Sequence, residues 1–333
     1  MVKMGIVAYD NCYLSSLSGP MDSFQVANAY NCRQSGSDDA TFEWNTVSIT
    51  GKPVKTSGGI SIATDMSIAN TCEFDVIYLP AFPYQGALAM DDMAKELQPL
   101  LDWLVSCWKR GTTIVTICTG SFLLAETGLL NGREATTTWW LEKQFHKRYP
   151  QVKLNGREMI TEQDRLMCAG AMTSYQNMSI HLIERYATAD LAIQCAKAML
   201  IDTSARAQSP YQNLLMDEAS GDPVVAKAQH WLQNHAKENI DQAELAIKMG
   251  VSQRTLIRRF KAELDLTPLS YLQNIRIETA KQLLENTTLP IIEVTERVGY
   301  ADISSFSRLF KQRTELTPAA YRQRFKTKET LNV

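Results

Sequence analysis

Residues 252–271 have the sequence SQRTLIRRFKAELDLTPLSY, and residues 302–321 have the sequence DISSFSRLFKQRTELTPAAY. Phe-Lys, Leu-Thr-Pro and Tyr recur between them at a constant offset of 50, as from Phe260 to Phe310. A constant offset is typical of two copies of one structural unit. The apolar residues of each copy recur at helical spacing, so the sequence predicts a helical repeat.

Each copy has the pattern of two short helices joined by a turn. In the first copy, a helix is expected over residues 243–249 and ends at Gly250, and Ser252 is the expected N-cap of the next helix. The second copy repeats the pattern with a helix over residues 292–298 and Asp302 as N-cap. A helix, a glycine turn and a helix that begins with polar and basic residues are typical of a helix-turn-helix unit.

The second helix of each copy has an apolar face for a core and a polar face suited to DNA. Arginine can pair bidentately with guanine in the major groove, and other basic residues can contact phosphates. A basic face that meets only solvent is the alternative, which the repeat disfavours. The residues predicted to contact DNA are Ser252, Gln253, Arg254, Ile257, Arg258 and Lys261 in the first copy, and Ser304, Ser305, Ser307, Arg308 and Lys311 in the second. Further phosphate contacts are expected from Arg259, Arg313, Arg322 and Arg324.

Residues 224–325 resemble the DNA-binding domain of AraC/XylS transcription factors. The segments SQRTLIRRFKAELDLTPLSYLQNIRIETAKQLL and VTERVGYADISSFSRLFKQRTELTPAAYRQRF carry the resemblance. It implies two helix-turn-helix units on one connecting helix, here expected over residues 269–285, that contact two successive major-groove segments. Ile257 departs from the usual polar choice, and a thymine methyl group is the partner expected for it.

The composition of the chain also divides in two. The 333 residues carry a net charge of −2, but residues 222–333 hold 17 Lys and Arg against 13 Asp and Glu, a net of +4. The preceding residues hold a net of −6, all seven cysteines and 14 of the 16 glycines. Only the second part is therefore a candidate for binding polyanions. We expect a sensor domain over residues 1–201, a linker over 202–222, packed in part through Tyr211, Leu214 and Leu215, and a DNA-binding domain over 223–328.

No targeting or membrane segment is expected. The apolar residues 2–9 are too short for a signal sequence, and no apolar run reaches the length of a membrane helix. The odd number of cysteines, without a CxxC pair, indicates free thiols in a reducing cytoplasm.

The first part alternates β-branched runs with helical patterns, which predicts an α/β doubly wound parallel sheet. An all-α domain with the two helix-turn-helix motifs follows it. Strands are expected over residues 3–9, 44–50, 75–80, 112–117 and 166–169. Helices are expected over residues 20–31, 93–110, 119–127, 139–149 and 174–200.

Cys118 lies where a buried strand meets a helix, in the segment TTIVTICTGSFLLAETGLLNG. A thiol on such a turn is exposed beside backbone N–H groups, and the helix N-terminus is expected to lower its pKa. Cys118 is therefore a nucleophile or a pocket residue, or else a small residue chosen for packing. Loops at the carboxyl ends of parallel strands meet in one crevice, so Asp22, the Pro80–Tyr84 loop and Trp139 are expected near it. Taken alone, Asp22 is better explained as a residue that caps the first helix and compensates its dipole.

Residues 4–200 resemble the PfpI/class I glutamine amidotransferase-like superfamily, mainly through ICTGSFLLAETGLLNGREATTTWW. Both resemblances together identify the chain as similar to the GlxA family of transcriptional regulators, with a flavodoxin-like, PfpI-type first domain. The superfamily pairs a Cys at this turn with a His and an acidic residue, and Cys118 and Asp22 match those places. Thr138 stands in the His place, and Ala81-Phe82 departs from the usual oxyanion loop. Thr is no general base near pH 7, so we expect no catalysis.

The sequence thus predicts a DNA-binding regulator whose first domain senses a small metabolite, and the family resemblance implies a nitrogen-containing one. The expected effector site comprises Asp22, Pro80, Ala81, Phe82, Tyr84, Cys118, Thr119, Thr138 and Trp139. The other expected partners are double-stranded DNA, RNA polymerase and a second copy of the chain, with no cofactor, metal or membrane. A Cys118-dependent hydrolase or amidotransferase-like enzyme and a redox sensor, each with a DNA-binding domain, are the alternatives.

Overall fold

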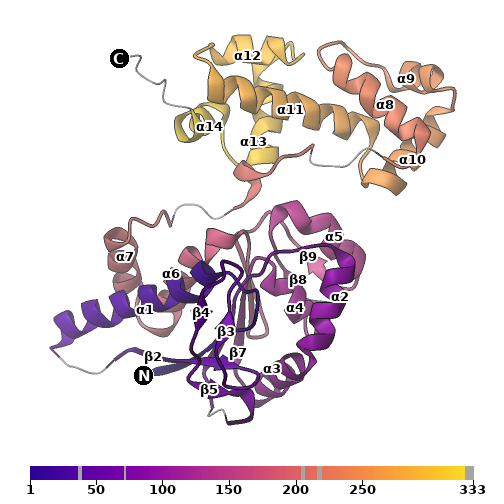
Figure 1. Ribbon diagram of the computed structural model, residues 1–333. Coiled ribbons are helices and arrows are strands. Elements are labelled where there is room, and N and C mark those ends of the chain that lie inside the picture. Colours follow the sequence, from indigo (N-terminus) through magenta and orange to yellow (C-terminus); the bar gives the residue numbers. More distant parts are fainter. Residues whose placement is uncertain (37–39, 71–72, 204–206, 216–219, 327–333) are drawn as a thin grey trace. The chain divides into compact units, whose positions relative to one another are not determined.

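The computed structural model describes residues 1–36, 40–70, 73–203, 207–215 and 220–326 (Figure 1). Cys72 lies outside this part, and so do residues 327–328, the last two of the predicted DNA-binding domain. The chain forms two compact units, Met1–Gln208 and Ser209–Val333, and the boundary falls inside the predicted 202–222 linker.

The first unit is built on a sheet with the strand order β10-β11-β7-β6-β1-β2-β5 in the described part. All neighbouring strands are parallel except β10 and β11. The predicted doubly wound parallel sheet is therefore confirmed. The strands are β1 (Val2–Val7), β2 (Phe42–Ser48), β5 (Met66–Ser67), β6 (Val76–Leu79), β7 (Thr113–Ile117), β10 (Ile160–Gln163) and β11 (Leu166–Ala169). Two short pairs lie outside this sheet, β3 (Val54–Lys55) with β4 (Ser61–Ile62) and β8 (Glu134–Ala135) with β9 (Lys153–Leu154).

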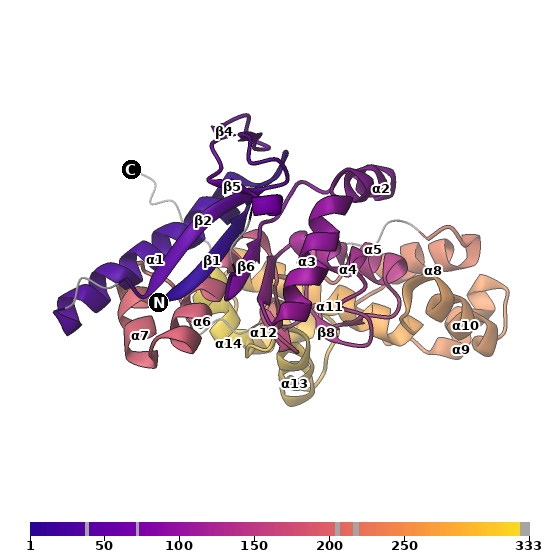
Figure 2. The ribbon, with the colours of Figure 1, turned by 90° about the horizontal axis from the view of Figure 1, so that it is seen from below.

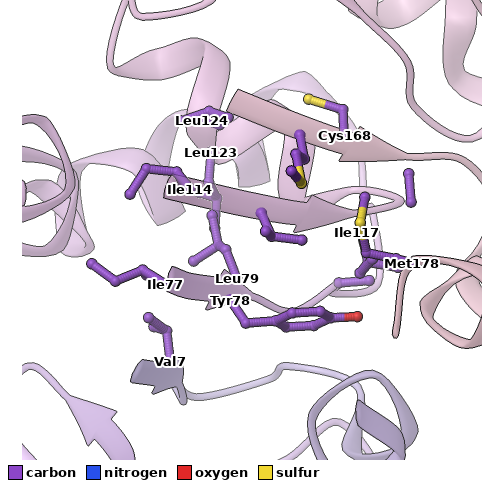
Figure 3. Close-up of a cluster of buried hydrophobic side chains, with 14 of the residues drawn as sticks. Val7, Ile77, Tyr78, Leu79, Ile114, Ile117, Leu123, Leu124, Cys168 and Met178 are labelled. Carbon is purple, nitrogen blue, oxygen red and sulfur yellow. The ribbon is translucent and has the colours of Figure 1, made fainter. Parts of the chain in front are cut away.

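Helices cover both faces of the sheet (Figure 2). One face carries α1 (Leu14–Ser35), α6 (Tyr175–Tyr186) and α7 (Ala189–Ala198), which pack on one another. The other carries α2 (Ala87–Glu96), α3 (Gln98–Arg110), α4 (Gly120–Glu126) and α5 (Glu142–Arg148). Every residue of β6 and β7 is buried. Figure 3 shows part of this core, with Ile77, Tyr78 and Leu79 of β6 and Ile114 and Ile117 of β7. Burial on both faces explains why these strands are almost wholly apolar.

Three of the predicted helices differ from the structure. The first begins at Leu14 rather than at residue 20 and contains Pro20, because buried Leu17 holds the preceding turns in the core. The helix predicted over 93–110 is two helices that meet at Leu97. The helix predicted over 174–200 breaks at Ala187, where Thr188 caps α7 by accepting a 3.1 Å hydrogen bond from the Leu191 N–H.

The second unit is helical throughout its described residues, as predicted. Its α-helices are α8 (Pro223–Asn234), α9 (Gln242–Met249), α10 (Gln253–Leu264), α11 (Pro268–Asn286), α12 (Ile291–Arg297), α13 (Ile303–Thr314) and α14 (Pro318–Phe325). A short 3-10 helix, η4 (Ser209–Tyr211), precedes them. The long helix α11 joins the two copies of the repeat, because its first half packs in the core of α8–α10 and its second half in the core of α12–α14. The expected packing of the linker is also present, since Leu214 and Leu215 pack on these cores and Tyr211 lies against Phe325.

Candidate functional site

The two helix-turn-helix units have the same local construction. The Ser252 hydroxyl accepts a 3.2 Å hydrogen bond from the Thr255 N–H at the start of α10. The Asp302 carboxylate caps α13 in the same way, at 2.7 Å from the Ser305 nitrogen. Hydrogen bonds from Ser305, first its hydroxyl and then its N–H, hold the pKa of Asp302 below its usual value. Both predicted N-caps are thus confirmed.

Each recognition helix, α10 and α13, buries one face and exposes the other. Leu256, Phe260, Phe306 and Phe310 are fully buried. Of the residues predicted to contact DNA, the exposed ones are Ser252, Gln253, Arg254, Arg258, Lys261, Ser304, Arg308 and Lys311, and the partly exposed ones are Ile257, Ser305 and Ser307. The structure therefore brings the predicted set onto the solvent face of each helix, together with Ile303, which sequence reasoning missed and which is 40% exposed.

The basic residues around these helices differ in how they are held. Arg259 bonds to Asp222 at 3.1 Å, and Arg324 bonds to the Tyr211 hydroxyl at 2.8 Å. These two predicted phosphate contacts are therefore engaged within the unit. Within the described residues, no hydrogen bond or ion pair is formed by the side chains of Arg254 and Arg258, so both guanidinium groups are available to a ligand.

Contacts through Arg276 fix the two helix-turn-helix units relative to one another. Its guanidinium donates 2.7 Å hydrogen bonds to the Ala236 and Glu238 carbonyls of the first copy. The same group lies 5.0 Å from the ring centroid of Tyr300 in the second copy. The two copies are also joined by α11, which has 19 residues and is therefore about 28 Å long. This length is comparable to the distance of about 34 Å between successive major-groove segments on one face of DNA.

In the first unit, Cys118 occupies the predicted strand-to-helix turn. It follows β7, precedes α4 and has a φ of 54°, the left-handed region that few non-glycine residues adopt. Its backbone is held from two sides, because its N–H donates to the Ala169 carbonyl at 2.9 Å and its carbonyl accepts from the Thr137 hydroxyl at 2.8 Å. This backbone is therefore fixed in a conformation that costs energy.

The expected lowering of the Cys118 pKa is wrong. Burial raises the pKa of this thiol to about 11, although the backbone N–H of Thr119 and the hydroxyls of Thr138 and Thr119 act in the opposite direction. The side chain is only 2% exposed, so desolvation of a thiolate outweighs the helix terminus. At neutral pH the group is a thiol, which is a weak nucleophile.

The loop after β6 is bonded to the Cys118 turn. The Thr119 hydroxyl donates to the Phe82 carbonyl at 2.6 Å and accepts from the Phe82 N–H at 2.8 Å. Pro80, Ala81, Phe82, Cys118 and Thr119 are thereby brought together, as predicted, at the carboxyl ends of β6 and β7.

The loop after β1 and the first turn of α1 also reach this place, which sequence reasoning missed. The Tyr9 hydroxyl donates to the Pro80 carbonyl at 2.7 Å, and the Ser16 hydroxyl accepts from the Ala81 N–H at 3.1 Å. No motif marked Tyr9 or Ser16, and their role follows only from the adjacency of β1 and β6 in the sheet.

The outer members of the predicted effector site are placed differently from one another. Thr138 is fully buried. Its hydroxyl lies beside the Cys118 sulfur, where it acts to lower the pKa of the thiol. Trp139 and Tyr84 are partly exposed, and Tyr84 packs on Phe122 at 5.2 Å between ring centroids. Asp22 does not open α1 but lies in its interior with an exposed side chain, so its predicted place at the helix start is wrong.

A cavity of about 370 Å³ lies elsewhere in the first unit. It is bounded by β10 and α6, and none of the predicted effector residues lines it. Its polar lining includes Glu158, Glu162, Asn177, His181 and Glu184. Glu162 is already engaged with Arg185 and His181, which limits what the cavity offers a ligand.

Comparison with known proteins agrees with this division. Residues 4–185 match the DJ-1/PfpI family, and residues 245–324 match a helix-turn-helix domain family. The regulator GbdR of Pseudomonas aeruginosa is 26% identical over 96% of this chain and 84% of its own, and the regulator CdhR of the same species is 28% identical over 84% and 81%. GlxA of Rhizobium meliloti is 25% identical over 65% and 67%.

Solved structures share the fold of the first unit. A transcriptional regulator protein of Vibrio parahaemolyticus matches with a TM-score of 0.51 and 17% identity, over 60% of this chain and 99% of that one. None of the helices in the described part of the chain is both long and apolar enough to cross a membrane. The chain belongs to the DJ-1/PfpI family and carries an AraC-type helix-turn-helix domain after it, the domain arrangement of a GlxA-like transcriptional regulator.

Proposed function

We propose that this protein binds specific DNA sequences through α10 and α13 and that a small metabolite, bound near Cys118, controls this binding. The observation that carries the proposal is the pair of equally capped helices whose solvent faces present Arg258 and Arg308 at equivalent places. Arginine at such a place can pair with guanine, while the neighbouring Lys311 contacts phosphates together with Lys261, which would first release its bond to Asp265.

Titration of a fluorescent duplex from the promoter beside its own gene tests DNA binding. Affinity should fall steeply between 50 and 200 mM salt, because each phosphate contact releases counterions. Arg258→Ala and Arg308→Ala should each weaken specific binding by about 1–3 kcal/mol, and the engaged Arg259 provides the control variant Arg259→Ala. Equal losses with all three variants, or equal affinity for unrelated DNA, would contradict base-specific contact.

The effector site is proposed at the carboxyl ends of β1, β6 and β7, where the direction of the crossovers changes. In doubly wound sheets ligands bind at this point. The segments after β1, β6 and β7 meet there through the hydrogen bonds of Tyr9, Ser16 and Thr119. Tyr84 in the loop after β6 and Trp139 after Thr138 add partly exposed aromatic rings. Aromatic faces suit a nitrogen-containing cation such as a quaternary amine or an amino acid.

Calorimetric titration with a panel of quaternary amines and amino acids tests this part. Trp139→Ala should abolish the heat of binding, whereas Trp140→Ala, a change of the exposed neighbouring ring, should leave it. Asp22, which is exposed on α1, is the proposed counter-charge for such a cation. Unchanged affinity in Trp139→Ala would remove the cation–π site.

The proposal includes no catalytic step. A thiol with a pKa of about 11 beside Thr138, which is no general base, lacks the groups that activate a cysteine nucleophile. The same burial disfavours a redox sensor, because oxidation follows thiolate character and exposure. The proposal further includes a homodimer, a contact with RNA polymerase and a location in the cytoplasm.

A further inference from the structure

Gln208 is a buried polar residue at the boundary between the two units. Its side chain is 2% exposed, although it lies in a segment whose composition is that of a linker. A buried amide is costly unless its hydrogen bonds are satisfied, so its surroundings decide what it does.

The Gln208 side chain fills a slot made largely of backbone groups. Its amide oxygen accepts a 2.9 Å hydrogen bond from the Ala171 N–H. Its amide nitrogen is shared among several acceptors, which are the carbonyls of Thr137 at 2.9 Å, Glu158 at 3.1 Å and Gly156 at 3.3 Å, and the Thr136 hydroxyl at 3.2 Å. Its backbone N–H donates to the Arg157 carbonyl at 2.7 Å. Both ends of the amide are therefore held.

Gly170 forms one wall of this slot. A Cβ atom at position 170 would overlap the Gln208 amide carbon, nitrogen and oxygen. The glycine is thus required by the close approach of the glutamine and not by a positive φ, because Gly170 is not among the positive-φ residues.

The slot is connected to the Cys118 turn through one residue. Thr137 donates its hydroxyl to the Cys118 carbonyl at 2.8 Å, and its own carbonyl accepts from Gln208. On the other side of Gln208 the chain continues into η4, where the Ser209 hydroxyl donates to Glu315 at 2.9 Å, the residue that ends recognition helix α13. One peptide bond thus joins Gln208, which is bonded to Thr137, to Ser209, which is bonded to Glu315 at the end of α13.

We propose that Gln208 is a positioning residue that transmits a movement of the Cys118 turn to the chain segment that anchors α13. A ligand that displaces the turn at Thr137 withdraws the carbonyl that holds the Gln208 amide and loosens residues 207–211. The inference rests on the proposed function for its purpose, but the link itself lies within the chain and needs no DNA to be measured.

Hydrogen exchange of the full-length protein tests the slot by a double-mutant cycle. Gln208→Met keeps the volume but removes the hydrogen bonds, and Gly170→Ala expels the side chain. Each should speed exchange of the amides of residues 207–209 and 211 about fivefold to tenfold, the effect of about one buried hydrogen bond. In a Gln208→Ala background, which leaves the slot open to the new methyl group, Gly170→Ala should add little. Additive effects, or wild-type exchange rates in Gln208→Met, would contradict the claim that the Gln208 amide in this slot holds the segment.

A second variant tests transmission. Thr137→Val removes only the hydroxyl that bonds to Cys118, and it should speed exchange at residues 207–211 in the wild-type background but not further in Gln208→Met. Thr161→Val, at another buried threonine of the same unit, is the control and should leave that segment unchanged. An equal response to Thr137→Val with and without Gln208 would overturn the proposal. Failure of DNA binding would leave these results intact, so the two failures are distinguishable.

Discussion

Gly250 and Gly299 hold equivalent turns of the two helix-turn-helix units, but their surroundings differ. Both have a positive φ, 74° and 89°. A Cβ added at Gly250 meets no atom within 4 Å, whereas one at Gly299 would lie 2.7 Å from the Lys237 carbonyl oxygen and 3.0 Å from its Cα. The second turn therefore packs on the backbone of the first copy, and the same substitution has two different costs.

The magnitudes follow from these contacts. Gly250→Ala introduces left-handed strain alone, about 1–2 kcal/mol. Gly299→Ala adds an overpacked backbone contact of roughly 1–3 kcal/mol, for a total of about 2–5 kcal/mol. The additional cost of Gly299→Ala arises at the contact with Lys237, which helps to set the relative position of the two recognition helices. Gly299→Ala should therefore also reduce the affinity for DNA that contacts both helices.

Native-state hydrogen exchange of the full chain measures the loss of stability caused by each of the two substitutions separately. Amides of α9 and α10 report on Gly250→Ala, and amides of α12 and α13 report on Gly299→Ala. We expect a larger loss of protection in the second case, by about fivefold to a hundredfold. Equal losses in the two units would refute the argument that the 299 turn is packed on residue 237.

Three further predictions concern the DNA-binding unit and the cysteine turn. Arg276→Met, which removes the bonds to the Ala236 and Glu238 carbonyls, should weaken binding to a duplex with both half-sites more than to one with a single half-site; equal weakening in a gel-shift titration would count against it. Ser252→Ala should destabilise the start of α10 by about 1 kcal/mol, seen as faster exchange of its first amides and absent in Ser304→Ala, which is no cap. Alkylation of Cys118 by iodoacetamide should rise about tenfold per pH unit toward about pH 11, because its raised pKa keeps it protonated below that range; a plateau near neutral pH would contradict the buried thiol.

Much of the DNA-binding unit could be predicted because its signals are local. The caps at Ser252 and Asp302 and the turn at Gly250 depend on residues within a few positions of one another. The repeat at an offset of 50 residues makes the same pattern occur in two copies. Five strands of the main sheet were found from apolar runs for the same reason, whereas β5 and β10 were missed. What escaped prediction depends on long-range packing, as where buried Leu17 carries α1 past Pro20.

The cysteine turn shows the limit of sequence patterns more sharply. The position of Cys118 between β7 and α4 follows from the motif, but its pKa depends on how much protein surrounds the sulfur. The helix terminus favours a thiolate, yet burial outweighs it. Ser16 and Gln208 have no motif at all, and only the sheet order and the closure of the slot reveal their contacts.

Selection from a random-sequence DNA pool tests most directly the central claim that α10 and α13 bind two separate half-sites. The wild-type protein should enrich one motif with two half-sites about 10 base pairs apart. Arg258→Ala should relax the sequence of one half-site and Arg308→Ala that of the other, while Arg259→Ala leaves both. No enriched motif, or relaxation of the same positions by both variants, would contradict the account.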